Sequence, residues 1–149
     1  MGIKNGIHIE GFDKLIKDLK AFGDEGVKRI AQTTEANARE IEVNAKQIAP
    51  YDLGDLRQNI KAIEVDNLNW KIYANAFGNA PYSAYMEFGT GGKVEVPAEL
   101  KDVAIKFIGK GIKQVNIRPR PYLYPSFVKG RVQYVKDLEN DLNDLTNKI

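Results

Sequence analysis

The sequence predicts a single α+β domain, in which an antiparallel sheet of about four strands packs against two long amphipathic helices. Two observations favour this class. Two long stretches repeat apolar side chains at helical spacing, and short alternating segments between them are joined by polar turns. Short turns favour antiparallel pairing, because parallel strands need a long crossover. The length of 149 residues suits one domain, so we expect residues 1–149 to fold together.

Alternating isoleucines in residues 1–10 favour a short strand at the start of the chain. Residues 12–22 place apolar side chains at helical spacing, which predicts a short amphipathic helix. The most regular pattern covers residues 27–48, where apolar positions recur every three or four residues. Pro50 ends this helix, because the residue before a proline is steered out of the helical region.

The middle of the chain predicts a loop, a hairpin and one more strand. Residues 51–60 contain the turn formers Asp and Gly, which favour a loop. Alternating segments at 61–65 and 70–74, separated by a four-residue polar connection, predict a β-hairpin. Residues 82–88 have the pattern of a third short strand in this region.

The last third predicts an inserted arm followed by a long helix. Residues 89–120 begin with a glycine-rich turn, and we expect them to form a flexible loop or arm. Within this arm, Pro97 at the first turn and apolar residues up to position 108 predict one short helix. The final helix is predicted by the apolar stripe Val128, Val132, Val135, Leu138, Leu142, Leu145 and Ile149.

Composition excludes several classes of protein. The chain has 22 Lys+Arg against 20 Asp+Glu, and 43% of its residues are hydrophobic, as in ordinary globular domains. It has no Cys, which excludes disulfides, thiol nucleophiles and cysteine-ligated zinc. No apolar run approaches the ~20 residues that span a bilayer, and the first ten residues lack a signal-peptide core. We therefore expect neither a membrane protein nor a secreted one.

The near-neutral total conceals two segments of opposite charge. Residues 51–92 carry 3 basic and 5 acidic side chains, whereas residues 93–132 carry 9 basic and 3 acidic ones. Charge complementarity of this kind fixes the register and choice of partner more than it adds affinity. The two segments are therefore candidates for contacts between different surfaces of neighbouring molecules.

Residue patterns for catalysis, cofactors or metals are sparse, so we expect no enzyme, cofactor or metal site. His8 lies between isoleucines without a ligand partner nearby, which favours a surface histidine. The run at residues 89–93 fails as a phosphate loop, because GxxxxGK[ST] and a following helix are missing. Asp52 and Asp55, near Arg57, fit turn or helix capping better than a two-carboxylate site.

Aromatic side chains alternate with arginines in the second half of the chain, around Arg118 and Arg120. Such mixtures stack bases and neutralise phosphates in single-stranded nucleic-acid sites. Interfaces between proteins enrich the same residue types. Packing in the core is a third interpretation for several of them. The spacing alone leaves these interpretations open for Tyr82, Tyr85, Phe88, Tyr122, Tyr124 and Phe127.

Three segments in a fixed order carry the most specific signal: residues 49–60 after the long helix, residues 82–90, and residues 120–127 before the last helix. We refer to them as motifs one, two and three. With the neighbouring Arg118, their candidate interface residues are Pro50, Asp52, Gly54, Leu56, Arg57, Tyr82, Tyr85, Glu87, Phe88, Gly89, Thr90, Arg120, Pro121, Tyr122 and Pro125.

The three motifs resemble those of the head–tail joining, or tail-completion, family of long-tailed double-stranded DNA bacteriophages. That family shows AP-x-DTG-x-L-x-x-SI, Y-x-x-(Y)-x-EFGT and RPFL-x-P segments in this order. The resemblance covers essentially the whole chain. Two positions depart from it, since Leu53 replaces the usual Thr and Asn59 the usual Ser.

The resemblance implies a structural virion protein of the neck and tail, without catalytic turnover and present in the host cytoplasm during assembly. It would form a ring, expected to be a hexamer, and partner with the head connector (stopper) protein and the tail tube protein. DNA would pass through the channel without sequence-specific binding, and no membrane contact is implied.

Within this reading, we hypothesise that Glu87, Arg118 and Arg120 hold motifs two and three together, within or between subunits. The main alternative is a nucleic-acid-binding module using the basic segment 93–132, whose binding would fall steeply with added salt. A third class, a small hydrolase or nuclease, would have to use the carboxylates of Asp52, Asp55 and Glu87.

Overall fold

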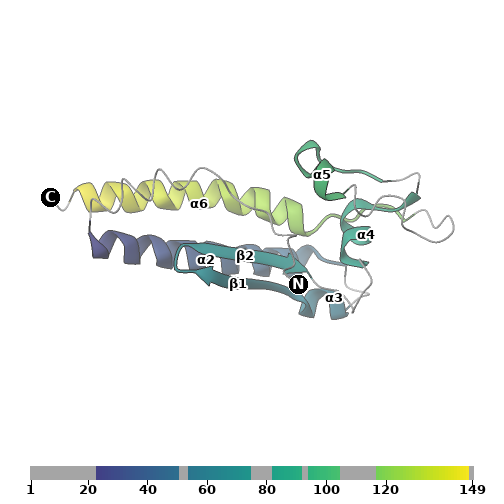
Figure 1. Ribbon diagram of the computed structural model, residues 1–149, viewed down its shortest axis with the longest axis horizontal. Coiled ribbons are helices and arrows are strands. Elements are labelled where there is room, and N and C mark those ends of the chain that lie inside the picture. Colours follow the sequence, from purple (N-terminus) through teal and green to yellow (C-terminus); the bar gives the residue numbers. More distant parts are fainter. Residues whose placement is uncertain (1–22, 51–53, 75–81, 92–93, 105–116, 148–149) are drawn as a thin grey trace.

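The computed structural model, drawn in Figure 1, confirms the mixed α+β class. It describes residues 23–50, 54–74, 82–91, 94–104 and 117–147. In this part of the chain, two long antiparallel helices lie side by side, and a two-stranded antiparallel sheet packs against the first of them. Short helical turns gather at the end of the molecule where the last helix begins (Figure 1).

The predicted long helix is confirmed as α2, which spans Asp24–Ile48. It begins after Gly23, whose φ of +83° is unfavourable for residues with a side chain, and it carries Asp24 and Glu25 in its first turn. At the other end, the Ala49 amide donates to the Ala45 carbonyl before the chain turns away. Its buried positions are Gly26, Ile30, Thr34, Asn37, Ala38, Ile41 and Ala45.

The final helix is confirmed as α6, which spans Leu123–Thr146. Its predicted apolar stripe is partly wrong, because Val132 is 53% exposed and Val135 is 42% exposed. The face that meets α2 runs instead through Gly130 and Tyr134 to Leu138. A Cβ on Gly130 would lie 2.2 Å from Cγ1 of Ile41, so the missing side chain lets the two helices approach closely.

Polar pairs and apolar contacts alternate along the α2–α6 interface. The Arg29 guanidinium donates to Asp141 at 2.6 Å, and Asp141 also accepts a hydrogen bond from the Thr33 hydroxyl. One turn further, the Asn37 amide donates to Asp137 at 2.9 Å. Ile30 and Leu138 pack together at the same level. These pairs fix the register of the two helices, because sliding one helix would leave half-buried polar groups without partners.

The predicted hairpin is confirmed as strands β1 (Ile60–Asp66) and β2 (Asn69–Ala74), with register from Ile60↔Ala74 to Glu64↔Trp70. Its connection is two residues long rather than four. The shorter turn forms because the Asp66 carboxylate accepts hydrogen bonds from the Leu68 amide and the Asn69 side chain, which closes the chain locally.

Glu42 of α2 attaches this hairpin to the helix. Its Oε2 accepts a hydrogen bond of 2.7 Å from the Ala62 amide, and Lys46 pairs with its other oxygen. Partial burial pushes the pKa of Glu42 upward, but these hydrogen bonds and the nearby positive charges outweigh that effect, so its pKa lies below the ordinary value. Beside it, the Arg39 guanidinium lies 5.0 Å from the Trp70 ring.

The expectation of about four strands is wrong for the described residues, which form a two-stranded sheet. The third predicted strand is helix α4, Tyr82–Phe88, because a short apolar run suits a strand and a buried helical turn equally well. Part of the predicted loop forms the short helix α3, Gly54–Gln58. The strand predicted in 1–10 and the helix predicted in 12–22 lie outside the described residues.

The predicted arm contains the helical turns η2 (Ala98–Leu100) and α5 (Lys101–Ala104), where one short helix was expected. Residues 105–116 lie outside the described part of the chain, and the single-domain boundary and the flexibility of the arm stay predictions. Among the helices that the structure describes, none is long and apolar enough to cross a membrane.

Replacing Gly130 by valine is expected to destabilise the protein by about 1–3 kcal/mol, because the new side chain collides with buried Ile41. Urea unfolding followed by circular dichroism measures the change. The matched control is Asn140→Val on the exposed side of α6, which should change stability by less than about 0.5 kcal/mol. Equal stability of the two variants would contradict the close helix packing.

Replacing Glu42 by glutamine should lower stability by about 1 kcal/mol at pH 7 and by much less at pH 3. A carboxylate with a depressed pKa stabilises the fold above its unfolded-state pKa, and this contribution is lost as the pH falls through the folded-state pKa. Urea unfolding at both pH values tests the difference. Glu35→Gln removes an exposed ion pair to Arg39 and should have little effect at either pH.

Candidate interaction site at the junction of α4 and α6

Motifs two and three meet where α4 reaches the beginning of α6. The side chain that joins them is Glu87, which is only 7% exposed. Its Oε2 accepts hydrogen bonds from the amides of Tyr122 (2.9 Å) and Leu123 (3.0 Å), and its Oε1 accepts one from Tyr124 (2.8 Å). The residue before α6 supplies no side-chain cap, so a carboxylate from α4 satisfies amides that a helix start leaves unpaired.

Backbone hydrogen bonds reinforce this junction. The Arg120 amide donates to the Met86 carbonyl at 2.7 Å. The Thr90 amide donates to the Ile117 carbonyl at 3.0 Å, and the Ile117 amide donates back to the Thr90 hydroxyl at 2.9 Å. Gly89 adopts a φ of +78° between these contacts, a left-handed conformation that favours glycine at this position.

A common core lies beneath all three motifs. It contains Leu56 of motif one, Met86 of motif two and Tyr122 of motif three, together with residues from α2 and β1. Leu56 is fully buried and Tyr122 is 1% exposed. Motif one also closes the end of α2, because the Arg57 guanidinium donates twice to the Ala49 carbonyl, at 3.0 and 2.7 Å. The three motifs are therefore parts of one packed structure.

Of the three residues expected to hold motifs two and three together, Glu87 does so within the chain, and the role of Arg118 and Arg120 between subunits stays a prediction. Glu87 joins the two motifs through backbone amides and not through the arginines. Within the described part of the chain, the side chains of Arg118 and Arg120 are exposed and make no ion pair. Arg120 contributes to the junction only through its backbone amide.

The remaining predicted interface residues differ in how exposed they are. Phe88 and Gly89 are buried, Pro50 and Tyr85 are half-buried, and Pro121 and Pro125 are exposed. Gly54 and Tyr82 are the first residues of α3 and α4. Asp52 lies outside the described residues.

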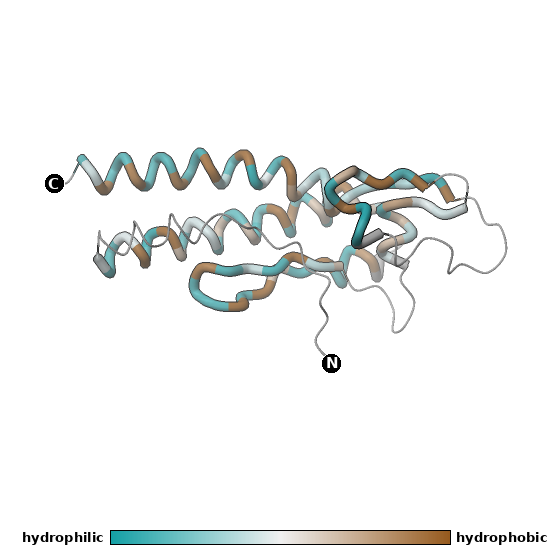
Figure 2. Tube along the Cα trace, turned by 45° about the horizontal axis from the view of Figure 1, so that its top comes forward, coloured by the Kyte–Doolittle hydropathy of each residue, from teal (hydrophilic) through white to brown (hydrophobic). Residues whose placement is uncertain are grey.

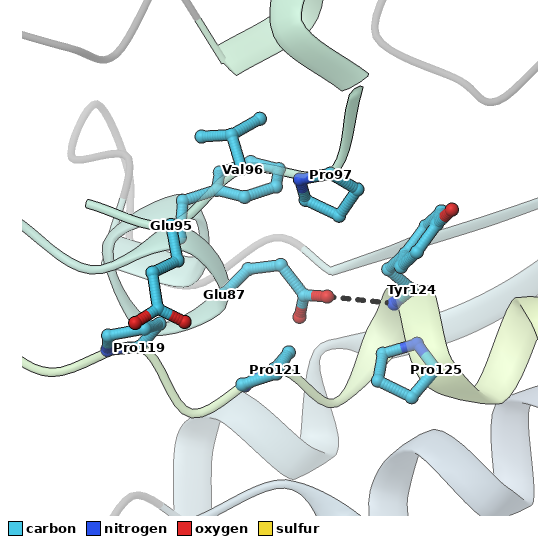
Figure 3. A pocket seen from close by; sticks show the side chains of 9 residues that line it. Glu87, Glu95, Val96, Pro97, Pro119, Pro121, Tyr124 and Pro125 are labelled. Atoms are coloured by element: carbon cyan, nitrogen blue, oxygen red, sulfur yellow. Dashed lines mark hydrogen bonds between the residues drawn. The ribbon is translucent and has the colours of Figure 1, made fainter. Parts of the chain in front are cut away.

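A pocket of about 290 Å³ opens beside Glu87, between motif two, motif three and the first part of the arm (Figure 3). Proline and aromatic rings make up most of its lining: four of the nine lining residues are prolines and two are aromatic. Both charged lining residues are glutamates. The lining consists of Glu87, Phe88, Glu95, Val96, Pro97, Pro119, Pro121, Tyr124 and Pro125.

The tyrosine of this pocket has a further partner, since the Tyr124 hydroxyl donates to Glu99 Oε2 at 3.1 Å. Desolvation raises the pKa of Tyr124, and the hydrogen bond to Glu99 and the charge of Glu99 raise it further. Sequence analysis missed Glu95, Val96, Pro97 and Pro119 as lining residues. The feature of the sequence that could have indicated the pocket is the close spacing of prolines at 119, 121 and 125. Each proline ring fixes its backbone φ angle, so the segment that leads into α6 is stiff.

The third function class, a hydrolase or nuclease, gains no support from this arrangement. Both oxygens of Glu87 already accept hydrogen bonds from backbone amides. Among the described residues, no group of three or more His, Cys, Asp or Glu side chains is placed to hold a metal ion. The Glu87 carboxylate is instead engaged in holding the start of α6.

Residues 13–89 match the family described as "Bacteriophage HK97-gp10, putative tail-component". The chain belongs to this family of bacteriophage tail components, which agrees with the tail-completion resemblance of the three motifs. No curated protein and no solved structure matches the chain.

Glu87→Gln should destabilise the protein by about 1–3 kcal/mol, because the three helix amides lose a charged acceptor. Hydrogen exchange gives a local readout, in which the amides of residues 122–124 should lose protection while those of α2 keep theirs. Glu95→Gln on the exposed rim is the matched control and should leave stability unchanged. Unchanged protection at residues 122–124 in Glu87→Gln would contradict the capping role.

Proposed function

We propose that the protein forms a hexameric ring at the phage neck, where it completes the tail end, joins the tail tube to the head connector and leaves a channel for DNA. The observation that supports this most is the convergence of the three tail-completion motifs on one junction, built by Leu56, Glu87 and Tyr122. Residues far apart in the sequence thus form one buried core beneath the exposed residues of the three motifs.

The division of the motifs into buried and exposed residues agrees with this function. Glu87 and Tyr122 hold the backbone in place, while Arg118, Arg120 and Pro121 stand on the surface around the pocket. Arginine and tyrosine are enriched in protein interfaces, because they combine large contact area with hydrogen bonding. In this proposal the buried residues shape the contact surface, and the exposed ones meet the partner.

The role proposed here is mechanical and needs no catalytic turnover. A neck ring has to hold its neighbours in a fixed orientation while DNA passes through. The paired helices α2 and α6 and the capped start of α6 supply that stiffness, because their polar contacts fix register as well as packing. In this proposal, the channel wall would interact with the charged phosphates of the DNA and would not recognise its base sequence.

The purified protein should assemble into a closed oligomer of one stoichiometry, expected to be six, in native mass spectrometry and in electron micrographs. Arg120→Glu should lower the ring fraction, because it reverses an exposed charge beside the junction. Lys136→Glu, an exposed residue in the middle of α6, is the control. A monomer that persists at high protein concentration would contradict the proposal.

A salt titration with duplex DNA separates the ring from the nucleic-acid-binding alternative. Ring formation predicts weak binding that disappears toward physiological salt, because contacts to phosphates release counterions. Tight binding at physiological salt by a monomer would instead favour a nucleic-acid-binding module using the segment 93–132.

A further inference from the structure

We propose that residues 94–104 of the arm form a strap that covers the pocket beside Glu87 in the single chain and lifts when the protein assembles. The strap would then be an autoinhibitory contact, because it keeps part of the contact surface away from neighbouring copies until a ring forms. The inference rests on the proposed ring. Three observations carry it: how lightly the strap is attached, what it covers, and how separately its base is held.

The strap is attached at two points. The structure gives two hydrogen bonds between described residues that join it to the rest of the molecule. At one end, the Glu95 amide donates to the Phe88 carbonyl at 2.9 Å. At the other end, the Tyr124 hydroxyl donates to Glu99 Oε2 at 3.1 Å, and this second hydrogen bond lies at the surface. The attachment between the two ends depends on apolar contacts.

Those apolar contacts are slight. From Val94 to Asp102, every side chain of the strap is half-buried or exposed. The helical turns η2 and α5 of the strap pack on each other. Segments with few buried apolar contacts open locally at a low cost in free energy, whereas a packed core opens only with much of the molecule. The strap therefore belongs to the part of the described chain that opens most readily.

The pocket separates the strap from the segment that leads into α6. Figure 3 shows Val96 and Pro97 on one side of the pocket, and Pro121 and Pro125 on the other side. The volume between them is about 290 Å³. The strap thus bridges the pocket and does not fill it, so few close contacts between apolar atoms are lost when it lifts.

The strap covers an aromatic residue of motif two. Phe88 lines the pocket and is buried, although it belongs to neither of the two described core clusters. Tyr124, the other aromatic lining residue, is half-buried and is held by the strap through Glu99. Phe and Tyr are enriched in the buried centre of protein interfaces. These two rings become available to a neighbouring copy once the strap lifts.

The base of the arm is held independently of the strap. Thr90 and Ile117 are joined by two hydrogen bonds, and Glu87 holds the start of α6 through backbone amides. Figure 1 places α5 at the end of the molecule where α6 begins, and Figure 2 shows the two long helices extending away from that end. The strap can therefore lift while the junction and the pairing of α2 with α6 stay intact.

A reversible crosslink tests the strap, because the natural chain has no Cys and introduced thiols are the only ones present. In the double variant Glu99→Cys/Tyr124→Cys, a bismaleimide reagent with a cleavable disulfide should join the strap to α6 within one chain. The locked protein should give about tenfold less ring than the same protein after reductive cleavage, because the competent open state is removed. Equal ring fractions before and after cleavage would overturn the inference.

The same crosslink distinguishes a cover from an exchanged arm. A product of single-chain size agrees with a strap that closes its own pocket. A ladder of covalent oligomers would instead place the strap of one copy on the pocket of the next, and would overturn the autoinhibitory contact.

Weakening the attachment supplies an independent readout. Glu99→Ala removes the acceptor of the Tyr124 hydroxyl, so the Glu95 amide should exchange its hydrogen about fivefold faster in the single chain. Rings should form at about fivefold lower protein concentration, because more of the chain is open. Asp102→Ala, which removes an exposed carboxylate from the same strap, is the matched control and should change neither quantity.

Equal exchange of the Glu95 amide in these two variants would overturn this inference alone, since the measurement does not depend on rings. Absence of rings in the natural chain would overturn the proposed function, and the inference with it.

Discussion

The carboxylate of Glu87 is the interaction on which the junction between α4 and α6 depends. Burying a carboxylate is unfavourable unless hydrogen bonds replace its water. The first amides of a helix are equally unfavourable to bury without acceptors. The three hydrogen bonds from the amides of Tyr122, Leu123 and Tyr124 meet both requirements at once. Because these bonds set where α6 begins, they also set the position of the pocket and of the arginines around it.

Hydrogen bonds from partly buried polar side chains also hold the rest of the described chain together. α2 serves two neighbours, with Asn37 directed to α6 and Glu42 directed to the hairpin. In each case a partly buried polar group has one well-defined partner, which makes alternative registers unfavourable. Such stiffness suits a family of tail components, whose proposed task is to hold neighbouring molecules in place. Ile63 and Val65 on the outer face of the hairpin stay exposed.

The long elements were predictable because their patterns extend over many residues. The helix of residues 24–48 shows six turns of regular spacing, and the hairpin shows two alternating runs around a polar turn. The short elements were not. The seven residues of α4 contain too few repeats to separate a strand from a helix. In α6, the exposed Val132 and Val135 belong to the same apolar pattern as buried Leu138, and only packing on α2 distinguishes them.

The sequence by itself determined the class of fold, the two long helices, the hairpin and the three motifs that indicate a phage tail component. The tertiary structure decided that these motifs share one core and that Glu87 binds amides 35 to 37 residues away. It also decided which charged side chains pair over long separations, since Arg29 of α2 meets Asp141 of α6, 112 residues away. The physical reason is that backbone amides have no sequence signature, and net charge does not say which side chains are brought together.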